Sequence, residues 1–215
     1  KICWNLFGPN FHDAFRWYTK LISRRNPVLD RVPLMSFSAT RWLDSNLSRS
    51  DRVFEYGSGG STLFLHDRVG ELISVEHAPD WYRIVESLLM LKYSERHSVL
   101  LREPQIGTPD PDGRVAQDFR DYIGVIDQYE DEYFDLVIVD GRVRPECVSH
   151  GVPKVKPGGF LLLDDADRPQ YQNAIKRLDG WTHSVLTGIS PYKYTFGVTG
   201  VWKKPDQTQA GTDPI

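Results

Sequence analysis

The stretch VFEYGSGGSTLFL, residues 53–65, constrains the fold of this chain more than any other. Val53 and Phe54 have strand character and precede a glycine-rich turn, which an apolar run follows. We expect Ser61 or Thr62 to be the N-cap of a helix over that run. Glycines allow a tight turn and let a ligand approach the backbone, and a helix N-terminus offers free N–H donors. The stretch therefore predicts a strand, a ligand-binding turn and a helix.

The acidic residue ahead of the glycines narrows the kind of ligand. The turn lacks the third glycine of the dinucleotide fingerprint G-x-G-x-x-G, because Thr62 stands at that position. Glu55 ends the strand, where its carboxylate would lie near the diphosphate of a dinucleotide. A ligand that carries an amino group and a sulfonium, and no phosphate, suits that carboxylate better.

Composition excludes several classes of protein. A chain of 215 residues accommodates one sizeable α/β domain and is short for two. A net charge of −3 with interspersed signs argues against nucleic acid as a partner. Cys3 and Cys147 provide neither a disulfide framework nor metal spacing. No apolar run approaches a membrane span and no signal-peptide core opens the chain, so we expect a cytoplasmic protein without a membrane partner.

Four stretches in order along the chain resemble the motifs of one family. They are VFEYGSGGSTLFL, LISVEHAPDWY, FDLVIVDGR and VKPGGFLLLDD. They are similar to the successive motifs of class I S-adenosylmethionine (SAM)-dependent methyltransferases, over roughly residues 41–203. The resemblance implies an enzyme with SAM as its cofactor. The alternative is an α/β domain with a glycine turn and no cofactor, because fold alone never establishes function.

The order of the predicted elements favours the same fold. Strands are expected at Arg52–Tyr56, 72–75, 98–101, 136–139 and 160–163, and helices at Phe11–Ile22, 38–47, 61–69, 81–91 (capped by Asp80), 115–129, 145–155 and 169–178. Two last strands, 180–187 and 194–202, have no room for a helix between them and should be antiparallel. We therefore expect a Rossmann-like, seven-stranded, mostly parallel α/β sheet with an antiparallel C-terminal hairpin and helices on both faces.

Three parts of the chain are expected. Residues 1–50 form an N-terminal helical cover, 51–203 the SAM-binding domain, and 204–215 a disordered tail. Residues 105–114 are rich in proline and glycine and are expected to be a loop, as 156–159 are to be a turn. The loop at 105–114 and the first helix are either a mobile lid over the site or plain surface structure.

Acidic residues recur at the ends of the predicted strands. They are Glu55, Glu76, Asp140, Asp164 and Asp165. Ligands of open α/β sheets bind at that edge, so a functional cluster is expected there. Glu76 lies 21 positions after Glu55, the distance at which an acidic side chain accepts both ribose hydroxyls.

The cofactor contacts follow from this placement. Glu55 and the turn should hold the methionine part of SAM, with the turn contributing Tyr56, Gly57, Ser58, Gly59, Gly60 and Ser61. Glu76 should hold the ribose. His77 either flanks the adenine or is structural. Trp81 and Tyr82 are expected in the helix core or at the surface rather than as an adenine platform.

The residues on the side of the site where the methyl acceptor would bind are harder to assign from the sequence. Arg142 and Arg144 follow Asp140 and either bind an anionic group of the acceptor or pair with nearby acids. The resemblance to Mg²⁺-dependent O-methyltransferases implies that Asp140, Asp164 and Asp165 ligate one Mg²⁺. The alternative is that Asp164 and Asp165 only cap the following helix. Arg142 stands where those enzymes carry a base and cannot easily accept a proton, so either the metal alone activates the acceptor or His150 takes the proton.

The function implied by the resemblance is methylation of a hydroxyl on a small molecule or glycan. Two other functions stay open: a non-catalytic protein of the SAM fold that binds a ligand or partner, and an aminopropyltransferase-like enzyme. The motifs place the catalytic residues at Asp140, Arg142 and His150 but do not identify the acceptor.

Overall fold

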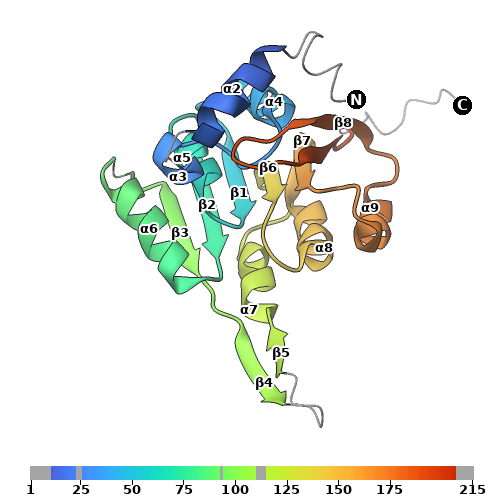
Figure 1. Cartoon of the computed structure of the whole chain (residues 1–215). Helices are drawn as coiled ribbons and strands as arrows, with labels where there is room; N and C mark the ends of the chain where they lie inside the picture. The colour runs from blue at the N-terminus through green and yellow to red at the C-terminus, as the bar shows by residue number, and fades with distance from the viewer. Residues whose placement is uncertain (1–10, 23–25, 93, 110–114, 207–215) are drawn as a thin grey trace, which may run out of the picture.

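A seven-stranded sheet forms the centre of the protein (Figure 1). The structure is a computed structural model and describes residues 11–22, 26–92, 94–109 and 115–206. The strands run in the order β3-β2-β1-β6-β7-β9-β8. Their bounds are Arg52–Tyr56 (β1), Glu71–Glu76 (β2), His97–Leu101 (β3), Phe134–Val139 (β6), Val155–Asp164 (β7), Thr182–Ile189 (β8) and Phe196–Lys203 (β9).

The topology confirms the predicted fold. Strands β3, β2, β1, β6 and β7 are parallel, whereas β9 pairs antiparallel with both β7 and β8. The chain first builds the sheet outward from β1 through β2 to β3, and then returns to place β6 on the other side of β1. The gap between the ends of β1 and β6 is therefore a topological switch point, where ligands of such sheets bind.

Helices cover both faces of the sheet, as predicted. On one face lie α3 (Pro27–Asp30), α4 (Phe37–Asn46), α5 (Gly60–His66) and α6 (Pro79–Met90). On the other lie α7 (Arg120–Ile123), the 3-10 helix η1 (Gly124–Gln128), α8 (Arg144–Lys154) and the short helices η2 (Pro169–Tyr171), α9 (Gln172–Ile175) and η3 (Lys176–Leu178).

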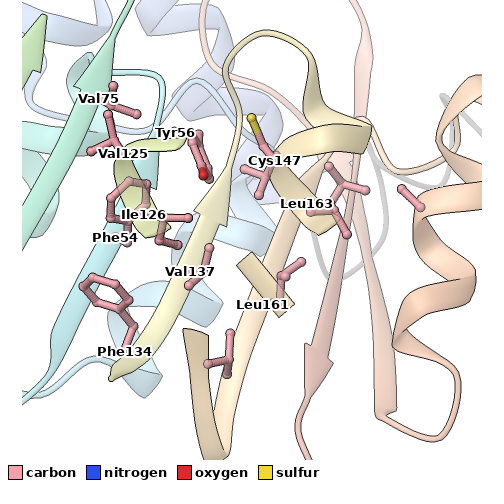
Figure 2. Close-up of a cluster of buried hydrophobic side chains, with 14 of the residues drawn as sticks. Phe54, Tyr56, Val75, Val125, Ile126, Phe134, Val137, Cys147, Leu161 and Leu163 are labelled. Atoms are coloured by element: carbon pink, nitrogen blue, oxygen red, sulfur yellow. The ribbon is translucent and has the colours of Figure 1, made fainter. Parts of the chain in front are cut away.

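The core beneath the second face is aromatic and aliphatic (Figure 2). Phe54 of β1 packs edge-on against Tyr56 and Phe134, with ring centroids 4.8 and 5.4 Å apart. Val137 and Leu161 continue this layer along β6 and β7. Strands buried on both faces read as near-continuous apolar runs, which explains why these strands are legible in the sequence.

The first helix and the helix before β1 lie together (Figure 1). The former, α2 (Phe11–Ile22), has the predicted bounds, and Trp17 Nε1 donates a hydrogen bond to the carbonyl of Lys193 in the β8–β9 turn. The latter, α4, buries Ala39 and Leu43 in the core against β1. Thus α4 is part of the body of the sheet domain, and the division at residue 50 stays a prediction.

The region after β3 differs from prediction. Residues 105–109 form β4 (Gln105–Pro109), which pairs antiparallel with β5 (Val115–Asp118), and this hairpin extends away from the sheet (Figure 1). The predicted loop and the predicted helix over 115–129 are both wrong in these parts, because each strand is stabilised by its partner rather than by its own pattern. The rest of the predicted helix is α7 and η1. Residues 110–114 lie outside the described residues, as do 207–215 of the predicted tail.

Several local predictions also need correction. The N-cap of α5 is Gly59, and Thr62 instead occupies the third helical position, where its hydroxyl accepts a hydrogen bond from Gly59 N. Ala78, not Asp80, is the N-cap of α6, because Pro79 starts the helix. Residues 156–159 are part of β7 rather than a turn, and the register between β6 and β7 shifts over this segment.

Within the described ranges, no helix has the length and apolar character needed to cross a membrane.

Candidate functional site

A cavity of about 540 Å³ lies at the switch point between β1 and β6. Three segments that follow strand ends supply most of its wall, together with two residues from the segment before α4. The lining residues are Pro27, Leu34, Gly57, Ser58, Gly59, Gly60, Ser61, Glu76, His77, Ala78, Trp81, Asp140, Gly141, Arg142 and Arg144. The volume suits a small-molecule ligand or cofactor.

Close backbone approach explains the glycines around this cavity. Gly57 has φ +94°, and a Cβ there would meet Gly141 Cα at 2.9 Å. A Cβ on Gly60 would meet the carbonyl oxygen of Val32 at 2.2 Å. The turn after β1 is thus pressed against both the turn after β6 and the segment before α4, and no larger residue fits either position.

Glu76 ends β2, and its carboxylate lies at the cavity wall. Oε2 accepts hydrogen bonds from the backbone N–H and the hydroxyl of Ser58, at 2.9 and 3.0 Å. Oε1 accepts from the backbone N–H groups of His77 and Ala78, at 2.8 and 2.9 Å. Burial raises the pKa of Glu76, but hydrogen bonds from His77, Ala78 and Ser58 outweigh it and lower the pKa to about 2. Glu76 is therefore a fixed negative charge at neutral pH.

Glu55 has a different environment, one strand away. Its side chain is fully buried, and Oε2 accepts hydrogen bonds from the hydroxyls of Thr62 and Ser74, both at 2.6 Å. Oε1 accepts no hydrogen bond from the described residues. Burial raises the pKa of Glu55 to about 7, although the hydroxyls of Ser61, Ser74 and Thr62 lower it. Glu55 does not line the cavity but supports the turn through Thr62.

Aromatic and cationic side chains flank Glu76. His77 places Nδ1 2.8 Å from Oε1 of Glu76, and its Nε2 accepts a hydrogen bond of 3.4 Å from Nε of the exposed Arg142. Trp81 of α6 donates from Nε1 to the carbonyl of Ser58 at 2.6 Å and lies against Gly59. Trp81 lies at the surface, as expected, and it also lines the cavity, which was not expected. The sequence could have indicated that Trp81 lines the cavity, since the first turn of a helix after a strand lies at the ligand-binding edge of the sheet.

The carboxylates of Asp140 and Asp165 and the backbone carbonyl of Asp164 meet around one guanidinium. Arg144 places its terminal nitrogens 3.0 Å from Oδ1 of Asp140 and 3.3 Å from Oδ2 of Asp165. Asp164 is buried, and its Oδ1 accepts a hydrogen bond of 2.7 Å from the hydroxyl of Thr199. Burial and the nearby Asp164 raise the pKa of Asp140 well above its ordinary value, while Arg144 and Lys193 lower it.

These three carboxylates do not form a metal site. Within the described part of the chain, no group of three or more histidine, cysteine or acidic side chains is arranged to hold a metal ion. The guanidinium of Arg144 lies against the carboxylates of Asp140 and Asp165, two of the three predicted Mg²⁺ ligands, while the Asp164 carboxylate is held by Thr199. The predicted donor set therefore does not fit the ion.

Two other predicted residues lie away from the cavity. His150 of α8 pairs through Nδ1 with Oδ2 of Asp127 at 2.7 Å and is largely exposed. Tyr56 is buried and donates a hydrogen bond from its hydroxyl to the carbonyl of Ile123. The structure thus brings together Gly57–Ser61, Glu76, His77, Asp140 and Arg142, but not His150 or the Tyr56 side chain.

No protein-family model and no curated protein matches this chain. Solved structures do resemble it. A methyltransferase-like protein from Silicibacter pomeroyi is 23% identical, with a TM-score of 0.53 over 80% of this chain and 89% of that one. An O-methyltransferase from Bacillus cereus, solved in complex with SAH, is 16% identical, with a TM-score of 0.59 over 88% and 97%. A tRNA methyltransferase from Aquifex aeolicus is 14% identical, with a TM-score of 0.52 over 79% and 68%. The chain therefore has the Rossmann-like fold of class I SAM-dependent methyltransferases.

Proposed function

We propose that this protein is a SAM-dependent methyltransferase that methylates a hydroxyl of a small molecule or sugar. The observation that carries the proposal is the cavity at the switch point, with the carboxylate of Glu76 held in its wall by four hydrogen bonds. The neighbouring structures support the fold, and they include enzymes with different acceptors. The choice of a hydroxyl acceptor rests on the motifs and on Asp140, which lines the acceptor side of the cavity.

The residues around the cavity fit SAM. The backbone of Gly57–Ser61 offers N–H groups and the close approach that the methionine part needs. Glu76 would accept the ribose hydroxyls, and the Ser58 hydroxyl, which now donates to it, would turn aside. His77 and Trp81 provide flat surfaces for the adenine. Glu55 stays a predicted contact of the amino group through Oε1, its buried oxygen without a partner among the described residues.

Asp140 is the group best placed to receive the proton of the acceptor. SAM, when bound, supplies an electrophilic methyl group and its own leaving group. Methyl transfer to a hydroxyl then requires that the acceptor oxygen lose its proton. Asp140 lines the cavity, and its raised pKa makes its carboxylate a better proton acceptor near neutral pH. Arg142 is exposed at the same wall and would bind an anionic group of the acceptor.

The proposal is tested by transfer of labelled methyl groups from SAM to a panel of sugars and phenols. We expect Asp140→Asn to lower kcat by about 100-fold or more, the range for loss of a general base, with little change in SAM affinity. Asp127→Asn, which alters an exposed carboxylate paired with His150, is the matched control and should retain activity. SAM binding without transfer to any acceptor would favour a non-catalytic ligand-binding protein. Reaction only with decarboxylated SAM would favour aminopropyl transfer.

A further inference from the structure

We propose that Arg144 is the resident cation of the carboxylate cluster Asp140, Asp164 and Asp165, and that it occupies the position a divalent metal would need. The side chain of Arg144 is only 12% exposed. It acts as a positioning residue for Asp140 and leaves this edge of the sheet without a metal site. The inference concerns the cluster itself and holds whichever acceptor is used.

Four hydrogen bonds engage the guanidinium of Arg144. Nε donates to the carbonyl of Gly141 at 3.0 Å. One terminal nitrogen donates to the carbonyl of Asp140 at 3.1 Å and lies 3.0 Å from its Oδ1. The other donates to the carbonyl of Asp164 at 2.5 Å and to Oδ2 of Asp165 at 3.3 Å. A guanidinium carries five N–H donors, and this one makes four hydrogen bonds and one further ion-pair contact, with Asp140.

These contacts favour one of the two interpretations of Arg144. Arg144 lines the cavity, but its guanidinium is engaged by backbone carbonyls and carboxylates of the two strand ends rather than left for an acceptor. Its planar fork instead joins the end of β6 to the end of β7, at the carbonyls of Asp140 and Asp164. Arg142, which is exposed and donates one hydrogen bond of 3.4 Å to His77, is the cation available for the acceptor.

The backbone supports the same conclusion. Arg144 is the first residue of α8, where the helix macrodipole disfavours a cation. The preceding residue, Val143, adopts φ 43°, a left-handed conformation that is rare for a β-branched side chain. Both features cost stability locally, and the contacts of Arg144 with the cluster provide the compensation.

Removal of the guanidinium should uncover a cation site. In Arg144→Ala the three carboxylates would keep their positions at two adjacent strand ends, but they would lose the charge that neutralises them. Carboxylate and carbonyl oxygens are the ligands that Mg²⁺ and Mn²⁺ prefer. Arg144→Lys would retain a positive charge in the cluster and should therefore still exclude the metal.

The probe is Mn²⁺ alone, titrated into each protein and followed by the loss of the free-ion signal in electron paramagnetic resonance. The parent and Arg144→Lys should bind Mn²⁺ only weakly. Arg144→Ala should bind one ion per chain at least about tenfold more tightly, since it leaves buried carboxylates uncompensated. This gain should disappear when Asp165→Asn is added. Arg168→Ala is the matched control, because Arg168 also contacts Asp165 but from the exposed surface, and it should behave as the parent does.

A merely structural role for Arg144 would produce loss of folding without any gain of metal. Circular dichroism is therefore measured on each variant, and Arg144→Met replaces Arg144→Ala if the latter does not fold. The proposal is overturned if the parent binds one Mn²⁺ that Asp165→Asn removes. It is equally overturned if the folded variant that lacks the guanidinium binds Mn²⁺ no more tightly than the parent.

Discussion

Glu55 and Glu76 end adjacent parallel strands, yet their carboxylates have opposite environments. Glu55 is enclosed, accepts two hydrogen bonds from hydroxyls, and has a pKa raised to about 7. Glu76 lies at the cavity wall, accepts three hydrogen bonds from backbone N–H groups and one from a hydroxyl, and has a pKa lowered to about 2. Residue type and motif position are therefore insufficient to assign a role.

The difference between the two glutamates arises from the backbone that follows each strand. After β1 the chain turns back over its own glutamate, so that Thr62 of α5 covers Glu55. After β2 the backbone N–H groups of residues 77 and 78 point at Glu76 and leave it open to the cavity. We infer that Glu76 meets the ligand at the cavity wall, and that Glu55 supports the glycine turn through Oε2 and leaves only Oε1 for the ligand.

The largest expected effect concerns stability and its dependence on pH. Between pH 4.5 and about 7 folded Glu55 retains a proton that the unfolded chain has released, so the free energy of unfolding should fall as pH rises through this window and level off above it. The contribution of one group shifted this far is on the order of 3 kcal/mol. Glu55→Gln should remove this part of the slope, as measured by chemical denaturation at several pH values.

Two comparisons sharpen that result. The pH dependence of stability that Glu76 contributes has the opposite sign. Its lowered pKa stabilises the fold above pH 4.5, and the contribution is lost as pH falls toward 2. Glu71→Gln, at the half-buried start of β2, is the control for a substitution on the same sheet. An unchanged slope between pH 4.5 and 7 in Glu55→Gln would show that Glu55 is not protonated in the folded protein.

The sequence predicted the sheet well because its strands are buried. The Arg52–Tyr56 strand has the predicted bounds, and the short connection near residue 190 correctly required an antiparallel hairpin. The β4–β5 hairpin was missed because a polar strand such as Val115–Asp118 depends on its partner, which no local pattern reveals.

The site was less predictable because side-chain partners come from distant elements. Strand ends located Glu76 and Asp140, but the position of Arg144 between the carboxylates of Asp140 and Asp165 depends on how the ends of β6 and β7 meet. His150 lies six positions after Arg144 on the same helix, and the helical period turns it to a different face. Neither relation follows from spacing alone.

A smaller effect is expected where α6 contributes Trp81 to the cavity wall. Trp81→Ala removes a flat surface beside Gly59 and the hydrogen bond to Ser58. We expect SAM affinity to fall by about 1 kcal/mol, the range for an aromatic contact. The Trp81 side chain is 37% exposed, so thermal stability should change little. Ile84→Ala is the control, because Ile84 is exposed on the same helix and does not line the cavity. Equal losses in both variants would remove Trp81 from the binding site.

Calorimetric titration of SAM tests most directly whether the cavity beside Glu76 is the cofactor site. The parent should bind one SAM per chain. Glu76→Ala should weaken binding by about 1–3 kcal/mol, the range for hydrogen bonds to a charged group. Glu71→Ala, at the other end of β2, should bind as the parent does. Absence of SAM binding in the folded parent, or equal affinity in Glu76→Ala, would contradict this account.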